Sequence, residues 1–249
     1  MTAPAPLHIG GERLMLDPCG VVAWPAQKLV AVADLHLEKG SALASRGRMV
    51  PPYDTKETLE RLSRALRRWN PARLVLLGDS FHDAAGCSRL AAPDHAALLT
   101  LLAGVEVTWV LGNHDPVPPA GLPGAAVEEI RLAPFTFRHI GRPGAVAELS
   151  GHFHPKATAP TRGVGVTRPC FLSDGRKLLL PAFGAYTGGL DVADPAIAAL
   201  FPRGGRAFLL GTERLYSFPT GPLRGRGAVV AEEPARPQLT AFGDEGRAR

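Results

Sequence analysis

The chain has 249 residues, 45% of them hydrophobic and 20% charged, and apolar runs recur as far as about residue 218. This length and composition support a buried core and exclude a largely disordered protein. Lysine and arginine outnumber aspartate and glutamate by 28 to 23, so the net charge is +5. A positive charge suits a phosphate-bearing partner, but a genomic bias toward arginine would produce the same excess. Without a signal-peptide pattern or an apolar stretch of membrane-spanning length, we expect a soluble cytoplasmic protein.

The first part of the chain alternates between predicted strands and helices. Residues 12–16 and 21–24 flank a turn with proline and glycine, which predicts a hairpin. Apolar runs typical of buried strands then alternate with helical periodicity in the order strand 29–33, helix 54–69, strand 74–77, helix 93–103 and strand 105–111. Asp54, followed three residues later by Glu57, predicts a cap at the start of the first helix. The alternation predicts a parallel sheet whose strands end at a common edge.

Beyond about residue 124 the helical periodicity is lost and short strand-like segments follow. These segments are residues 127–132, 135–140, 145–149, 170–172, 177–180 and 207–210. Turn residues at 173–175 predict a hairpin, and a short helix is expected at 195–200. The second half is thus predicted to be a mostly antiparallel sheet. We expect residues 1–218 to form one domain and 219–249, rich in proline, glycine and arginine, to form a flexible tail.

Clusters of aspartate, histidine and asparagine follow several of the predicted strands. They are Asp34 with His36, Asp79 after a glycine, Asn113-His114-Asp115, a single His139, and His152 with His154. Carboxylate, imidazole and amide ligands without cysteine suit Mn²⁺, Fe or Zn²⁺ better than Ca²⁺. Because residues i and i+2 of an extended strand point the same way, Asp34 with His36 is expected to present two ligands to one side. The same holds for His152 with His154, and the sequence therefore predicts two adjacent metal ions with an aspartate between them.

These blocks, in this order, resemble the signature of the calcineurin-like metallophosphoesterases. Longer stretches are similar to one bacterial subgroup, the ligase-associated DNA damage response endonucleases, namely Ala33–Gly40, Pro51–Thr55, Gly78–Asp83 and Pro181–Gly189. The resemblance extends over about residues 7–217. It implies an α/β fold, a four-layer α/β/β/α sandwich with two packed sheets. It also implies association with a DNA ligase and a helicase.

The resemblance further implies a role for each residue of the predicted site. The first metal ion is expected on Asp34, His36, Asp79 and His154. The second is expected on Asp79, which bridges the ions, and on Asn113, His139 and His152. His114 is expected to act as an acid beside the phosphate, with Asp115 orienting it. Substrate contacts are expected at Asn113, His82, Tyr186 and Arg46.

Some of these residues also fit simpler roles. His82 fits closure of the loop after its strand, and Tyr186 fits packing beside glycines. Arg61, Arg64 and Arg68 share one face of the helix 54–69, which is typical of a solvated face and also of a nucleic-acid contact.

The function expected from these features is metal-dependent hydrolysis of phosphodiester bonds. Hydroxide formed from a water that two metal ions share would attack the phosphorus, with manganese favoured over iron and zinc. The resemblance implies DNA as the substrate and an endonuclease of DNA repair. The alternative is a phosphodiesterase or phosphomonoesterase that acts on nucleotides or other small esters. The shape of the site distinguishes the two functions, because a DNA substrate needs an open groove, whereas a small ester also fits a capped pocket. A non-catalytic interaction scaffold of the same fold is less favoured, because such scaffolds lose ligands that this chain has.

Overall fold

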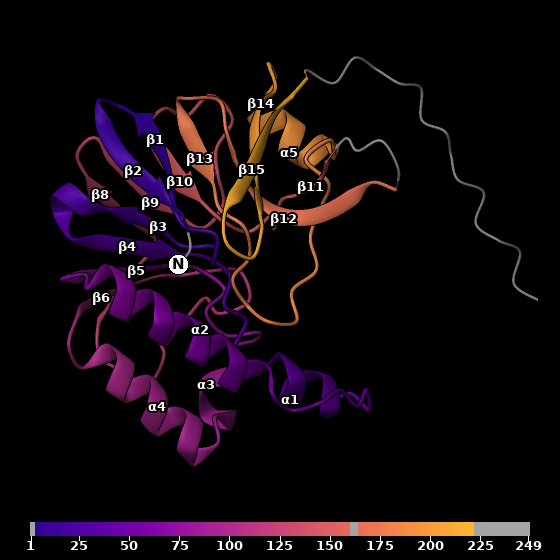
Figure 1. The fold of residues 1–249 in the computed structure, drawn as a ribbon. Coiled ribbons are helices and arrows are strands. Elements are labelled where there is room, and N and C mark those ends of the chain that lie inside the picture. The colour runs from indigo at the N-terminus through magenta and orange to yellow at the C-terminus, as the bar shows by residue number, and fades with distance from the viewer. Residues whose placement is uncertain (1–2, 160–163, 222–249) are drawn as a thin grey trace, which may run out of the picture.

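The strands of the first half pair as the alternation predicts and form one sheet of a two-sheet sandwich (Figure 1). The computed structural model describes residues 3–159 and 164–221. Within these residues the first sheet has seven strands, in the order β1 (Ala5–Ile9), β2 (Glu12–Leu16), β3 (Val22–Trp24), β4 (Leu29–Val32), β5 (Arg73–Leu77), β6 (Glu106–Val110) and β7 (Ala125–Val127). From β4 to β7 the strands are parallel, so β4, β5 and β6 end at the same edge.

The second sheet is mostly antiparallel, as predicted. Among the described residues its order is β15 (Leu215–Thr220), β14 (Gly205–Leu210), β12 (Val166–Ser173), β13 (Lys177–Leu179), β10 (Glu148–Ser150), β9 (Phe135–Arg138) and β8 (Glu129–Leu132), with β11 (Lys156–Ala159) paired to β12. The exception to the antiparallel pattern is β10, which lies parallel to both β13 and β9. The parallel pair β9 and β10 therefore ends at one edge, like the strands of the first sheet.

Helices cover the outer faces of the two sheets and complete the predicted four layers. Four helices lie on the side of the first sheet that faces away from the second sheet, namely α1 (Lys39–Ala44), α2 (Asp54–Trp69), α3 (Gly86–Arg89) and α4 (Ala92–Leu102). The short helix η1 (Pro25–Gln27) connects β3 and β4. Helix α5 (Pro195–Leu200) packs on the outer face of the second sheet. In the part of the chain that the structure describes, no helix is both long and apolar enough to cross a membrane.

Strand β4 is buried on both faces, which explains its continuous apolar run. Leu29 and Ala31 belong to the core between the two sheets, whereas Val30 and Val32 belong to a second core with α2 and α4. Alternate side chains of a strand point to opposite faces, so a strand between two apolar layers must be apolar throughout. The rigid β4 fixes the position of the polar residues that follow it.

The structure differs from the sequence-based expectations at several elements. The single strand predicted at 127–132 is two strands, β7 in the first sheet and β8 in the second. Sequence patterns also did not predict β1, β11, β15, α1 or α3, which are short or lie at the margins of the sheets. Asp54 does not cap α2; its Oδ2 accepts a hydrogen bond from the Gly40 amide at 2.9 Å, which joins α2 to α1. Strand β15 extends through Thr220, two residues into the expected tail, and residues 222–249 of that tail lie outside the described residues.

Candidate active site

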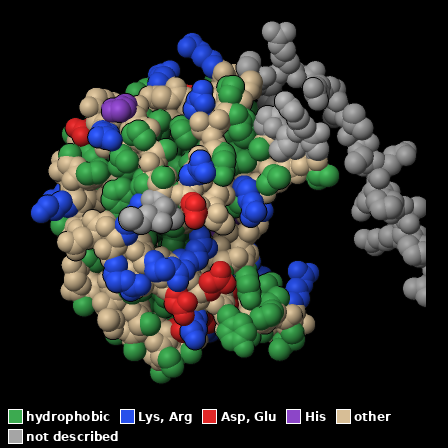
Figure 2. Space-filling view, in the orientation of Figure 1, with side chains coloured by type: hydrophobic (Ala, Val, Ile, Leu, Met, Phe, Trp, Pro, Cys, Tyr) green, Lys and Arg blue, Asp and Glu red, His purple; other side chains and the backbone are tan. Residues whose placement is uncertain are grey.

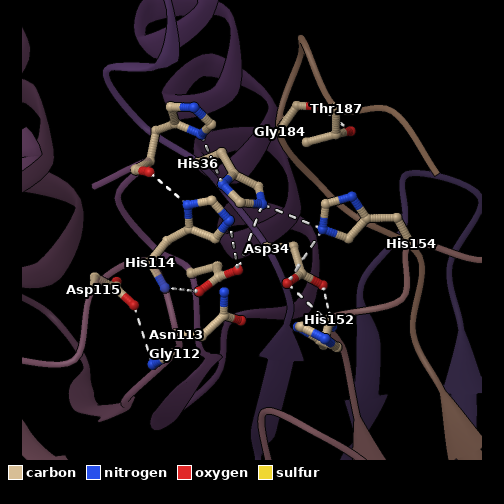
Figure 3. A network of polar contacts seen from close by, with 12 residues as sticks. Asp34, His36, Gly112, Asn113, His114, Asp115, His152, His154, Gly184 and Thr187 are labelled. Carbon is tan, nitrogen blue, oxygen red and sulfur yellow. Dashed lines mark hydrogen bonds and ion pairs between the residues drawn. The ribbon is translucent and has the colours of Figure 1, made fainter. Parts of the chain in front are cut away.

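The polar clusters meet at one edge of the sandwich, where strands of both sheets end (Figure 3). Asp34 follows β4, Asp79 follows β5 and His114 follows β6 in the first sheet. In the second sheet His139 follows β9 and His152 follows β10. The parallel pairing within each sheet brings these strand ends side by side. The sandwich thereby joins side chains as far as 118 positions apart in the sequence.

The backbone is left-handed rather than extended at five of the seven predicted ligands. The angle φ is +55° at Asp34, +44° at His36 and +47° at Asp79. It is +75° at His152 and +47° at His154. Asp34 and His36 belong to one cluster of ligand atoms, whereas His152 and His154 belong to two adjacent clusters, and the extended-strand argument for these pairs was wrong. The left-handed conformation costs a non-glycine residue about 1–2 kcal/mol, and backbone hydrogen bonds such as that from the His36 amide to the Asp79 carbonyl, at 2.8 Å, hold it in place.

Asp34, His36 and His154 form a first cluster whose ligand atoms lie within 4.8 Å of one another. His36 Nε2 and His154 Nε2 are 3.2 Å apart, and Asp34 Oδ1 lies 3.5 Å from His154 Nε2. The His152 amide donates to both Asp34 oxygens, at 3.2 and 2.9 Å, and so orients the carboxylate. Nitrogen and oxygen lone pairs converge here on one point, which is the arrangement that a bound cation satisfies.

Asp79, His139 and His152 form a second cluster of the same size. His139 Nδ1 lies 3.0 Å from the Leu77 carbonyl oxygen, so Nδ1 donates and the Nε2 lone pair faces the cluster. His139 Nε2 is 3.0 Å from Asn113 Oδ1 and 3.2 Å from His152 Nδ1. The structure thus brings His139, which belongs to no local motif, together with its expected partners.

Asp79 lies between the two clusters. Its Oδ2 is 3.8 Å from His36 Nε2 on one side and 3.4 Å from His139 Nε2 on the other. Its Oδ1 accepts a hydrogen bond from the His114 backbone amide at 2.9 Å, and the side chain is only 2% exposed. One carboxylate therefore faces both sets of ligands, which is the position that bridging two ions requires.

Burial and neighbouring charges set the protonation of these groups. Burial and the charge of His154 lower the pKa of His36 to about 2, and burial and the charge of His139 lower the pKa of His152. Burial acts to raise the pKa of Asp79, but its hydrogen bond and charge interaction with His139 outweigh burial and keep the pKa below its usual range. Burial acts to lower the pKa of His139, but the hydrogen bond to Asp79 raises it. Neutral imidazole and ionised carboxylate are the metal-binding forms, so the shifts at His36, His152 and Asp79 favour metal binding, whereas the raised pKa of His139 favours its protonated ring.

The donor set of the two clusters fits divalent metal ions. It combines carboxylate, imidazole and amide groups, a mixture that suits Mn²⁺, Fe or Zn²⁺ better than the all-oxygen preference of Ca²⁺. A further group joins His36, His82 and His114 within 4.8 Å, where His82 Nδ1 lies 3.3 Å from His36 Nδ1. His82 thus contacts an expected metal ligand and does more than close its loop.

His114 lies beside the clusters, but Asp115 does not orient its ring as the resemblance implies. His114 Nε2 is 4.0 Å from Asp79 Oδ2, and its Nδ1 is 2.8 Å from the His82 carbonyl oxygen, which holds the ring. The Asp115 carboxylate instead accepts hydrogen bonds from the backbone amides of Ser80, Phe81 and Gly112. Burial raises the pKa of Asp115 to about 6. Asp115 therefore joins the loop after β5 to the loop after β6.

The remaining expected substrate contacts, Tyr186 and Arg46, lie near the site without forming part of the clusters. The Tyr186 hydroxyl donates to the Pro51 carbonyl at 2.8 Å, so it connects the loop 184–189 to the segment before α2. Arg46 is exposed just after α1. Burial lowers the pKa of His82 to about 4, and the charges of Lys39 and Arg46 act in the same direction.

Two of the three arginines expected on one face of α2 contact other parts of the fold and are not left on a solvated face. Arg61 donates to the Phe183 carbonyl at 2.8 Å, and its guanidinium lies 4.5 Å from the centre of the Phe183 ring. Arg68 Nε lies 3.3 Å from Asp17 Oδ2. The helical periodicity correctly predicted a shared face, but it carried no information about the loops that pack on it.

Glycines beside the ligands have a packing role that the sequence analysis missed. A Cβ on Gly112 would collide with Asp79 Oδ1, and a Cβ on Gly78 would collide with the His139 ring. The available signal was the repeated order of strand, glycine and ligand, which also occurs at Gly151 before His152.

We expect Gly78→Ala to destabilise the protein through this collision. The matched control is Gly144→Ala, because Gly144 has the same φ of +75° but nothing within 4 Å of an added Cβ. Overpacking should lower the free energy of unfolding by about 1–3 kcal/mol more at position 78 than at 144. Urea unfolding of the two variants measures the difference, and equal losses would mean that His139 moves aside freely.

The family model of the calcineurin-like phosphoesterases matches residues 27–166, more than half of the chain. The chain belongs to this family. The matched segment contains both clusters described above, from Asp34 to His154. As a calcineurin-like phosphoesterase the protein is a hydrolase that acts on phosphate esters, and its two packed sheets with flanking helices are the fold expected from the sequence.

Among solved structures, the protein is similar to a nuclease. The Pseudomonas putida nuclease MPE is 30% identical, with a TM-score of 0.67, and the match covers 87% of this chain and 100% of that one. Yfce, a phosphoesterase from E. coli, is 15% identical with a TM-score of 0.37, over 76% of this chain and 97% of that one, a similarity too low to inform function. No curated protein sequence matches this phosphoesterase.

Proposed function

We propose that this phosphoesterase is a two-metal nuclease that hydrolyses phosphodiester bonds in DNA. The observation that carries the proposal is the position of Asp79, whose Oδ2 lies 3.8 Å from His36 Nε2 and 3.4 Å from His139 Nε2, between two clusters of ligand atoms. A carboxylate shared by two cation sites is the arrangement of two-metal phosphodiester hydrolysis. The similarity to the Pseudomonas putida nuclease over that protein's whole length supports a polynucleotide substrate.

Each cluster would hold one divalent ion, with Mn²⁺ preferred over Fe and Zn²⁺. The first ion would bind Asp34, His36, His154 and Asp79. The second would bind Asp79, His139, His152 and Asn113. When bound, such a pair of ions lowers the pKa of a shared water, so that hydroxide is available near neutral pH, and offsets the charge of the phosphate.

His114 is the residue placed to protonate the leaving oxygen. Its Nδ1 is held by the His82 carbonyl at 2.8 Å, so Nε2 faces the clusters, 4.0 Å from Asp79 Oδ2. The side chain is 41% exposed and therefore reachable by a phosphate ester from solvent. A positioned acid of this kind contributes about 10²–10⁴ to the rate.

The exposure of the site favours a polynucleotide over a small ester. Both Asn113 and His114 are exposed, whereas a site built for a nucleotide alone is usually a pocket that buries most of its ligand. The charges of Lys39 and Arg46 lower the pKa of His82, which supports a positive electrostatic environment at this edge of the site. The sequence resemblance to the ligase-associated endonucleases supports a role in DNA repair beside a ligase and a helicase. The scaffold alternative is disfavoured because buried polar clusters are costly without a ligand.

A parallel assay of four substrates tests the proposal. Protein stripped with a chelator and reloaded with Mn²⁺, Fe²⁺ or Zn²⁺ is given single-stranded DNA, duplex DNA, bis(p-nitrophenyl) phosphate and p-nitrophenyl phosphate. We expect metal-dependent cleavage of DNA and of the diester, with much slower cleavage of the monoester. Cleavage of the monoester or of free nucleotides alone would support the small-ester alternative, and inactivity with every metal would support the scaffold.

A further inference from the structure

The segment between α1 and α2 exposes large apolar side chains instead of burying them. Met49 is 84% exposed and Tyr53 is 63% exposed, and Pro51 and Pro52 between them are exposed as well. Figure 2 shows hydrophobic side chains gathered in this region, at the lower right of the molecule and at the rim of a notch in its side. Exposed aromatic and flexible thioether side chains four residues apart in one segment are of the kind found at binding surfaces.

Two sets of contacts fix this segment beside the candidate active site. The Tyr186 hydroxyl donates to the Pro51 carbonyl at 2.8 Å, and the loop that carries Tyr186 begins at Gly184, whose amide donates to the Asp34 carbonyl at 3.0 Å. Figure 3 places Gly184 and Thr187 next to His36 and His154. The segment is therefore one loop away from the first ligand cluster.

A buried carboxylate links α1 to the start of α2, on the two sides of the segment. Glu38, which comes two residues after His36, accepts hydrogen bonds from the hydroxyls of Thr55 at 2.9 Å and Ser41 at 2.7 Å. The Glu38 amide also donates to the Thr55 hydroxyl at 2.9 Å. The start of α2, and with it Tyr53, is thus linked to the backbone that carries an expected metal ligand.

The exposed charges from residue 39 to residue 56 are positive, and the first exposed acidic side chain follows at Glu57 in α2. From residue 39 to residue 56, all of which the structure describes, the cations are Lys39, Arg46, Arg48 and Lys56. The single acidic residue in the stretch, Asp54, is 5% exposed and accepts a hydrogen bond from the Gly40 amide. Apolar and aromatic side chains among cations match a polynucleotide strand, which offers base faces and phosphates in alternation.

We propose that residues 46–53 form a strand-binding rim, on which Tyr53 and Met49 stack against unpaired bases while Arg46 and Arg48 bind the neighbouring phosphates. The inference rests on the proposed nuclease function and adds the residues that bind the strand beside the cleaved bond. In a duplex the base faces are covered by their neighbours, so this rim favours an unpaired stretch of the substrate. The bases are recognised by stacking, which predicts little sequence preference.

The test compares Tyr53→Ala with Tyr53→Phe and with Tyr216→Ala in the full chain loaded with Mn²⁺. Tyr216 is a matched control, because it is 56% exposed on β15 and belongs to neither the site nor the rim. The readouts are KM and kcat for a single-stranded oligonucleotide and the hydrolysis rate of bis(p-nitrophenyl) phosphate. We expect Tyr53→Ala to raise the KM for the oligonucleotide about tenfold, which corresponds to about 1.4 kcal/mol. The hydrolysis rate of bis(p-nitrophenyl) phosphate should change much less.

The other variants separate stacking from hydrogen bonding and from general damage. Tyr53→Phe keeps the ring and should retain the KM of the parent protein, and Tyr216→Ala should leave both activities unaltered. If Tyr53→Ala cleaves the oligonucleotide with the KM of the parent, the rim is wrong while the nuclease function stands. If the parent cleaves the small diester but no oligonucleotide, the nuclease function and the rim are both overturned.

Discussion

Replacing Asp79 by asparagine is expected to abolish turnover and to lower the metal content of the protein. The carboxylate lies 3.8 Å from His36 Nε2 and 3.4 Å from His139 Nε2, so it is the group that both ions would share. Asparagine keeps the size of the side chain but removes its negative charge, which leaves two cations close together with less compensation. We expect a fall in kcat of at least about a thousandfold, equivalent to about 4 kcal/mol of transition-state stabilisation.

Metal analysis decides how this loss is interpreted. Elemental analysis of the purified variant should find fewer than two ions per chain, whereas Asp94→Asn, a substitution in the first turn of α4, should leave metal content and activity at those of the parent. The fold is expected to survive, because asparagine Oδ1 still accepts the hydrogen bond from the His114 amide. A variant that retains two ions and full activity would refute the bridging assignment.

His114→Ala is expected to retain its metal ions while losing turnover. The contact between His114 and Asp79 Oδ1 is made by the backbone amide, so the substitution leaves that hydrogen bond in place. What is removed is the ring whose Nδ1 is held by the His82 carbonyl and whose Nε2 faces the site. We expect a loss of about 10²–10⁴ in kcat on DNA, whose alkoxide leaving group needs a proton.

The leaving group provides the control for this role. An aryl phosphodiester releases a phenolate that hardly needs protonation, so the loss on bis(p-nitrophenyl) phosphate should be much smaller than on DNA. A similar loss on both substrates, with metal content unaltered, would argue that His114 positions the phosphate and does not donate a proton.

The elements that sequence reasoning predicted well are those with strong local patterns. The apolar runs of β4 and β5 identify strands buried on both faces, and the Leu59 and Leu62 stripe identifies the buried face of α2. The rule that parallel strands end at a common edge then predicts where Asp34 and Asp79 meet. Strong periodicity and a general topological rule were thus sufficient for the central strands of the first sheet.

Features that depend on distant contacts were beyond the reach of sequence patterns. Asp54 has the pattern of a helix cap but binds the Gly40 amide, and Asp115 follows His114 in sequence but binds amides of a different loop. The parallel pairing of β10 with β9, which brings His139 to the site, involves strands of only a few residues. Short strands carry little local signal, so register and direction are set by the tertiary fold.

The left-handed backbone at the ligands is the clearest case of this limit. Positive φ is uncommon for any residue other than glycine, although aspartate and histidine adopt it more often than most, and the sequence around Asp34 and His36 shows an ordinary strand end. The conformation becomes favourable only because neighbouring strands supply hydrogen bonds, such as that from the Gly184 amide to the Asp34 carbonyl at 3.0 Å. Strain of this kind concentrates at functional sites, where the surrounding fold stabilises it.

The central claim is that one carboxylate holds two metal ions. Its most direct test is anomalous diffraction from crystals grown with Mn²⁺. We predict two anomalous peaks, one among Asp34, His36 and His154 and the other among Asn113, His139 and His152, with Asp79 Oδ2 between them. A single peak, or two peaks that do not share Asp79, would contradict the account.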